Sequence, residues 1–101
     1  MADRYEGKPL LRLLELYVLW CIDELSDNDR AAMEEMTPHL QRVYQRTGTW
    51  QAILESVMDL PPGAPEQVRA VWKTARAGGA AANVPIPAET FARMFVDRNL
   101  T

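Results

Sequence analysis

The segment from Leu10 to Leu25 constrains the fold more than any other part of the sequence. Twelve of its sixteen residues are apolar or aromatic. The spacing predicts a helix that begins near Pro9, because proline suits the first helical position, and that runs to about Leu25. At 100° per residue one narrow stripe holds most of the polar positions, Arg12, Glu15 and Asp23, together with Leu19. The remaining arc is almost entirely apolar, so the helix is either the central rod of a bundle or part of a subunit interface.

Helical spacing recurs along the rest of the chain, whereas period-two alternation of β-branched residues is nearly absent. A second helix is predicted from the capping pair Ser26 and Asp29, with a kink or a clean break at Thr37-Pro38 and an end at Gly48. Further helices are predicted after the cap Thr49 as far as Pro61-Pro62-Gly63, after Pro65 as far as Gly78-Gly79, and from near Pro87. The apolar positions at helical spacing on these helices are Met33, Met36, Leu40, Val43 and Tyr44, then the one-sided stripe of Trp50, Ile53, Leu54, Val57 and Met58, then Val68, Val71, Trp72 and Ala75, which are expected to point inward, and finally Phe91, Met94 and Phe95.

These elements predict an all-α fold, a compact bundle of five or six short helices around the apolar first helix. One domain spans residues 1–101, with an N-terminal arm at 1–8 and a flexible linker at 78–86 before the last helix. The composition, 48% apolar and 25% charged, is that of a globular protein.

Several features bear on the cellular setting. The longest uncharged apolar run, Leu16 to Ile22, is seven residues, whereas a membrane span needs about 20. The single cysteine, Cys21, cannot form an intramolecular disulfide, which favours a cytoplasmic protein. The segments 5–12 and 91–97 are typical of the ends of a compact bacterial protein. We therefore expect a small soluble bacterial protein of the cytoplasm.

Residues suited to chemistry are few and scattered. His39 is the only histidine, and Cys21 lies in the apolar first helix, where core packing is expected. Asp27-Asn28-Asp29 lacks the spacing of a calcium loop, and the glycines match neither phosphate-binding pattern. The sequence therefore predicts no catalytic, cofactor-binding or metal-ligating residue, and a non-catalytic protein is favoured over an enzyme.

The net charge of −3 is unevenly distributed. Residues 1–36 hold nine acids and four bases, whereas residues 37–101 hold five acids and seven bases. The acids that form a possible face for a basic partner are Asp23, Glu24, Asp27, Asp29, Glu34 and Glu35; a solvated helix end is the simpler explanation. The bases Arg69, Lys73 and Arg76 recur along the fourth helix, opposite the stripe that contains Trp72, and form a weak nucleic-acid candidate. Three bases are few for a nucleic-acid surface, and an ordinary exposed helix face explains them, so nucleic acid is not the expected partner.

Three functional hypotheses remain open at this stage. The first is a protein-interaction module that binds its own copy through the first helix, with Leu11, Leu14, Val18 and Leu19 as the interface, or that binds another protein. The second is a small acidic inhibitor, of the immunity-protein or antitoxin type, that neutralises a basic partner. The third is a small-molecule-binding protein or enzyme whose site lies between helices or subunits, with Glu15, His39 or Tyr17 as polar groups in an apolar pocket.

Overall fold

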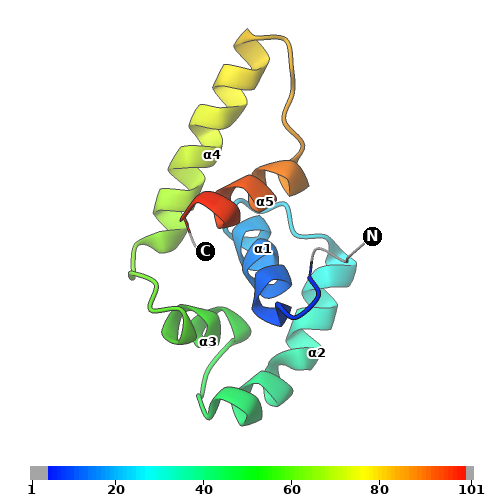
Figure 1. Ribbon diagram of the computed structural model, residues 1–101, viewed down its shortest axis with the longest axis vertical. Coiled ribbons are helices and arrows are strands. Elements are labelled where there is room, and N and C mark those ends of the chain that lie inside the picture. The colour runs from blue at the N-terminus through cyan, green and yellow to red at the C-terminus, as the bar shows by residue number, and fades with distance from the viewer. Residues whose placement is uncertain (1–4, 100–101) are drawn as a thin grey trace.

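A computed structural model describes residues 5–99 of the chain, and within that range it is all-helical with no strand. The described residues form five helices, α1 (Pro9–Cys21), α2 (Asp27–Tyr44), α3 (Trp50–Val57), α4 (Ala64–Ala81) and α5 (Ala88–Asn99) (Figure 1). The predicted fold class, a helical bundle around an apolar first helix, is confirmed.

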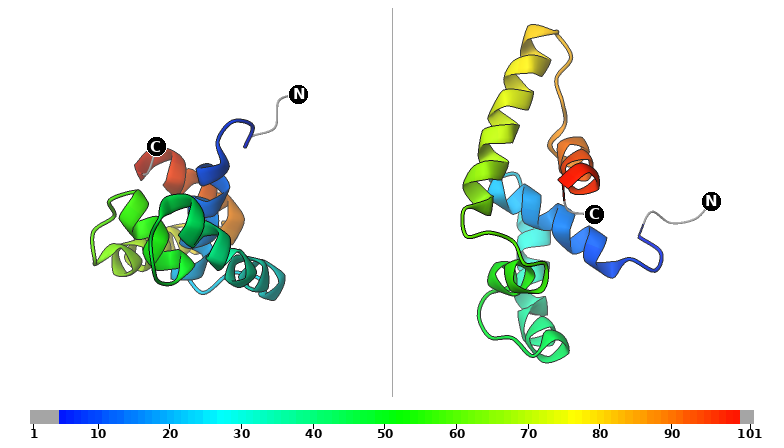
Figure 2. Two further views of the ribbon diagram at one scale, coloured as in Figure 1. Left: turned by 90° about the horizontal axis from the view of Figure 1, so that it is seen from below. Right: turned by 60° about the vertical axis from the view of Figure 1, so that its left-hand side comes forward.

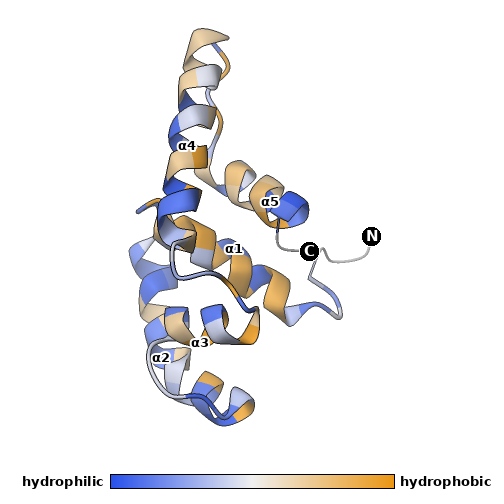
Figure 3. Cartoon of the chain, turned by 90° about the vertical axis from the view of Figure 1, so that its left-hand side faces the viewer, coloured by the Kyte–Doolittle hydropathy of each residue, from blue (hydrophilic) through white to orange (hydrophobic). Residues whose placement is uncertain are grey.

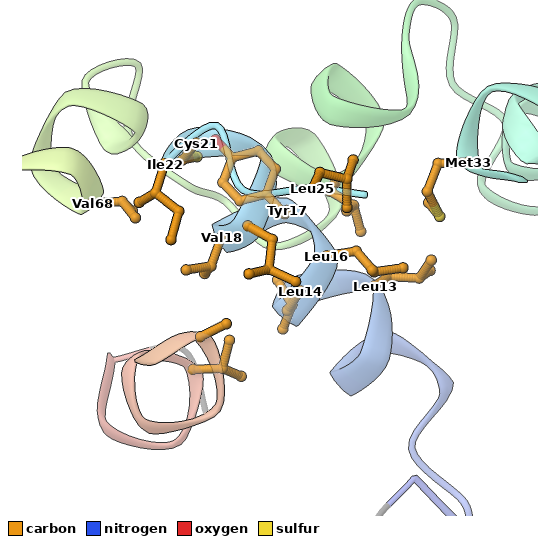
Figure 4. Close-up of a cluster of buried hydrophobic side chains, with 14 of the residues drawn as sticks. Leu13, Leu14, Leu16, Tyr17, Val18, Cys21, Ile22, Leu25, Met33 and Val68 are labelled. Carbon is orange, nitrogen blue, oxygen red and sulfur yellow. The ribbon is translucent and has the colours of Figure 1, made fainter. Parts of the chain in front are cut away.

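The first helix is the centre of the bundle. It packs against α3, α4 and α5, while α2 packs chiefly on α3. In Figure 4, Leu13 and Leu16 of α1 lie on the side of Met33 of α2, and Ile22, directly after α1, lies beside Val68 of α4. In Figure 3 most of α1 is coloured as hydrophobic, with blue at its few polar residues, whereas α2 is mixed in character. The wide apolar arc of α1 is therefore the arc of a central rod that several helices cover.

The first helix ends four residues earlier than predicted, at Cys21 rather than Leu25. Asp23 adopts a left-handed conformation with φ of 59°. Its N–H donates to the Trp20 carbonyl at 3.1 Å, and the Glu24 N–H donates to the Leu19 carbonyl at 2.9 Å, which together form a Schellman motif. The chain then turns so that Leu25, although outside the helix, is still buried.

The second helix begins as predicted, because the Ser26 hydroxyl accepts a hydrogen bond from the Asp29 N–H at 3.1 Å. It continues through Pro38 as one element, so the alternative of a clean break is wrong. It ends at Tyr44, before the predicted stop at Gly48, because Gln45 takes a left-handed conformation with φ of 52°.

The fourth helix runs past the predicted stop at Gly78-Gly79 to Ala81, so the first four residues of the predicted 78–86 linker are helical. Its C-terminal half projects from the body of the molecule, and the segment that follows returns beside it to α5 (Figures 1 and 2). The returning segment passes so close to α4 that only glycine fits at position 79, because a Cβ there would lie 2.7 Å from the Val84 carbonyl oxygen. The left-handed residue after the end of α4 is Asn83, with φ of 59°, and not one of the two glycines at which the helix was predicted to end.

The described helices include none that is both long and apolar enough to cross a membrane. Of the predicted N-terminal arm, residues 1–4 lie outside the described residues. Residues 5–8 form a turn, in which the Lys8 N–H donates to the Tyr5 carbonyl at 2.9 Å.

Candidate functional site

The interface predicted on α1 is buried inside the chain itself. Leu11, Leu14, Val18 and Leu19 expose 8%, 2%, 0% and 3% of their surface. The helices α3, α4 and α5 cover these side chains, so they are not available to a second copy. The prediction that these four residues face a partner is wrong, because the apolar arc that suggested it is used in the monomer core.

Glu15 is a buried carboxylate between α1, α5 and the N-terminal turn. It is 1% exposed and accepts a hydrogen bond from the Tyr5 hydroxyl at 2.8 Å. Arg93 of α5 lies 3.7 Å from its Oε1, and Arg12 lies 3.9 Å from the same oxygen. A buried charge is tolerated when cations and hydrogen bonds surround it, so this cluster holds α5 and the N-terminal turn against α1.

Glu15, His39 and Tyr17, the alternative polar groups predicted for an apolar pocket, lie in three different settings. Tyr17 follows Glu15 by two positions and therefore points about 200° away from it around α1. The Tyr17 hydroxyl donates to Glu55 Oε1 of α3 at 3.0 Å. His39 is exposed on α2, and the structure gives it no hydrogen bond or ion pair with another described residue.

Cys21 lies one turn after Tyr17 on α1 and is buried as predicted. Burial raises the pKa of the Cys21 thiol to about 11. Burial likewise raises the pKa of Tyr17 above its ordinary value, with the neighbouring Cys21 and Glu55 adding to the effect. Both groups stay protonated at neutral pH, which is the setting of structural side chains and not of nucleophiles.

The bases of α4 do not form a free surface. The Arg69 Nε donates to the Cys21 carbonyl at 2.8 Å and so closes the end of α1. The Arg76 guanidinium lies over the Trp72 ring, 5.6 Å from its centroid. The prediction that these bases lie opposite Trp72 is therefore wrong for Arg76, and of the three only Lys73 is given no such contact by the structure.

Two of the acids predicted to face a basic partner pair with arginines of the same chain. Asp29 lies 3.8 Å from Arg12, and Asp23 lies 3.9 Å from Arg30. Glu34 and Glu35 are neighbours on α2 and point about 100° apart. Glu24 lines a hollow that Trp72 and Arg76 also line. No three His, Cys, Asp or Glu side chains among residues 5–99 are placed to share a metal ion.

A hollow with a volume of about 570 Å³ lies between the connection from α3 to α4, α4 itself and α5, with Tyr17 of α1 in its wall. Its apolar lining is Met58, Leu60, Pro61, Ala64, Val68 and Phe95. Its polar neighbours Asp59, Gln67 and Asn99 are exposed, and the Tyr17 hydroxyl is already engaged by Glu55. A buried polar group directed into the hollow, which would orient a ligand, is thus not among its described lining residues.

The outer surface of α2 carries the feature that the sequence reasoning missed. The sequence groups Met36 and Val43 with Met33 and Leu40 as apolar positions at helical spacing. Met36 and Val43 are 39% and 55% exposed, whereas Met33 and Leu40 are buried at 2% and 3%. The apolar arc of α2 is wide, and α3 covers only one side of it. The available signal was the seven-residue interval between Met36 and Val43, which repeats the interval between Met33 and Leu40 about 60° further around the helix.

Together with Ala32 and His39, which are also exposed, Met36 and Val43 form a line along the helix that we call the α2 stripe. At 100° per residue its four members fall within an arc of about 60°. Figures 1 and 2 place α2 at the edge of the molecule, at the end opposite the projecting half of α4.

Comparisons of the chain with protein-family models, with curated proteins and with solved structures found no match.

Proposed function

We propose that this chain is a non-catalytic protein-interaction module that binds its partner through the α2 stripe. The observation that carries the proposal is the pair Met36 and Val43, two large apolar side chains left exposed at a seven-residue interval on an 18-residue helix. Single exposed apolar residues are common on protein surfaces, but a line of them along one helix matches the anchor spacing with which a helix enters a groove or pairs with another helix.

The packing of α2 supports this assignment. Only Met33 and Leu40 of its 18 residues are buried. An isolated helix of this length is marginal in water, and α2 also contains Pro38. Full burial of a large apolar side chain contributes about 1.5–3 kcal/mol, so a partner that covered Met36 and Val43 would add stabilisation that the monomer leaves unused.

The state of the reactive groups favours binding over chemistry. Cys21 and Tyr17 are buried and hold their protons, and Glu15 is enclosed by Arg12 and Arg93. The hollow beside Tyr17 offers a ligand an apolar wall without an inward polar group, so it supports the small-molecule alternative less well. The acidic-inhibitor alternative is weakened at Asp29, which is partly covered and lies 3.8 Å from Arg12 of the same chain.

The proposal retains the expectation of a bacterial cytoplasmic protein, which rests on the lone cysteine and on the sequences of the two chain ends. It abandons α1 as the binding surface, since that surface is buried. What remains of the original hypothesis is an interaction module with its interface moved from α1 to α2.

A site-specific photo-crosslinking residue in place of Val43 tests the proposal in cells of the source organism. The matched control carries the same residue in place of Val84, which is 63% exposed and lies in the return segment after α4. We expect a crosslinked adduct of defined mass from position 43, lost when Met36→Asp is added, and none from position 84. Equal crosslinking at both positions, or none at position 43, would refute the α2 stripe as the binding surface.

A further inference from the structure

We infer that the partner on the α2 stripe is a second copy of this chain, whose α2 lies antiparallel to the first. This inference rests on the proposed function and adds the identity and orientation of the partner. The charges that flank the α2 stripe on the side away from α3 favour this partner and this orientation.

The two flanks of the α2 stripe differ. On one side lie Met33 and Leu40, which are buried and packed toward α3. On the other side lie Glu35 and Arg42, both exposed and seven residues apart. Placed at 100° per residue, they stand about 70° and 90° from the centre of the stripe, on the same flank. The open flank of α2 therefore presents one acid in its N-terminal half and one base in its C-terminal half.

Neither of these charges is satisfied within the described chain. The structure gives no ion pair to Glu35 or to Arg42 with any residue between 5 and 99. A seven-residue separation spans about 10 Å along a helix, which is too far for the two to pair with each other. Both remain available to a partner helix that lies along the stripe.

An antiparallel copy supplies the complementary charges. A two-fold axis perpendicular to α2 sets the open flank of one helix beside the open flank of the other. The register that places Met36 against Val43 of the copy brings Glu35 next to Arg42 of the copy, and Arg42 next to Glu35 of the copy. The two His39 side chains then lie near the axis. One self-complementary surface thus forms two equivalent ion pairs around the apolar contacts of the α2 stripe.

A parallel copy does not fit these features. In a parallel pair the open flank of each helix faces the opposite flank of its copy, which is the side that Met33 and Leu40 turn toward α3. Glu35 and Arg42 would then lie beside an already packed helix pair instead of beside each other. The antiparallel arrangement leaves α3 and its copy on one side of the pair and the four charges on the other.

Charge reversal on the full chain tests both partner and orientation, with sedimentation velocity from micromolar to millimolar concentration as the readout. We expect the wild type to reach twice the mass of the chain as the concentration rises. Glu35→Arg and Arg42→Glu each replace two attractive pairs with two repulsive ones and should raise the dimer dissociation constant by about tenfold. Because both positions are exposed, thermal unfolding should show that the variants remain folded.

The diagnostic results come from recombining the two variants. The double variant Glu35→Arg/Arg42→Glu should dimerise like the wild type, and an equimolar mixture of the two single variants should form a heterodimer more readily than either forms a homodimer. Met36→Asp should abolish association, and Val84→Asp should leave it unchanged.

A wild type that stays monomeric throughout, single variants that associate like the wild type, or a double variant that fails to recover would each overturn the inference. These failures are distinguishable from failure of the proposed function. If the chain is monomeric but the residue at position 43 still crosslinks to a different protein in cells, the α2 stripe is a binding surface and the second copy is not its partner.

Discussion

Two adjacent glycines near the end of α4 occupy different environments although both lie in helical conformation. A Cβ built at Gly78 meets no neighbouring atom within 4 Å, whereas one built at Gly79 lies 2.7 Å from the Val84 carbonyl oxygen and 3.4 Å from Ile86. The return segment thus approaches the helix backbone at Gly79 and not at Gly78. The sequence alone presents Gly78-Gly79 as one helix stop, because glycine marks both helix ends and close backbone approaches.

Alanine at these two positions should have opposite effects. Gly78→Ala should raise the free energy of unfolding by about 0.5–1 kcal/mol, because alanine is the better helix former. Gly79→Ala should lower the free energy of unfolding by about 1–3 kcal/mol, because the return segment must move away from the new methyl group. Urea unfolding of the two variants measures both changes. A stabilising Gly79→Ala would show that the return segment does not pack on α4 as described.

At the scale of the helices, starts were predictable and ends were not. Ser26 and Thr49 cap α2 and α3 as expected, since a hydroxyl followed by helical spacing has few other interpretations. One or two residues after the last residue of each of α1 to α4 stands a residue that has positive φ and is not glycine. These residues are Asp23, Gln45, Asp59 and Asn83. Aspartate and asparagine tolerate the left-handed region better than most side chains, but they occur at so many other places that they do not mark a helix end in a sequence.

The sides of the helices were predictable in kind but not in extent. Met33, Leu40, Val68, Trp72 and Phe91 are buried as expected. Met36, Val43, Val71 and Met94 had the same helical spacing and are exposed at 39–55%. Periodicity shows that a helix has an apolar arc, but how much of that arc is covered depends on where its neighbours lie. The candidate site consists of α2 residues of this second kind, which is why sequence reasoning did not find it.

Pro38 provides a test at the scale of the element. It lies inside α2, is exposed, and lacks the N–H that would bond to the Glu34 carbonyl. Pro38→Ala should therefore raise the free energy of unfolding by about 1–3 kcal/mol. As the control, Pro62→Ala in the α3–α4 connection should lower it by about 0.4–1 kcal/mol, because it only frees the unfolded chain. Circular dichroism with thermal melts checks both, and a Pro38→Ala variant less stable than the wild type would contradict a continuous α2.

At the scale of the whole molecule, the structure decides why α1 is so apolar, which the sequence alone does not. A helix apolar on most sides suits either the centre of a bundle or a subunit interface, and only the positions of α3, α4 and α5 decide between them. Here they enclose α1, with the buried Glu15 held by Arg93 of α5 and the Tyr17 hydroxyl bonded to Glu55 of α3. The monomer thus uses its most apolar helix internally and leaves two large apolar residues uncovered on α2, compared with Val71 alone on α4 and Met94 alone on α5.

The division of the molecule into a central α1 and an outlying α2 makes a direct prediction about where association occurs. Amide resonances recorded as the chain is concentrated from micromolar to millimolar report each residue separately. We predict concentration-dependent shifts at the α2 stripe and its open flank, Ala32, Glu35, Met36, His39, Arg42 and Val43, with none along residues 74–84 at the far end of α4. Shifts confined to α4 and its return segment, or a spectrum independent of concentration, would contradict self-association through α2.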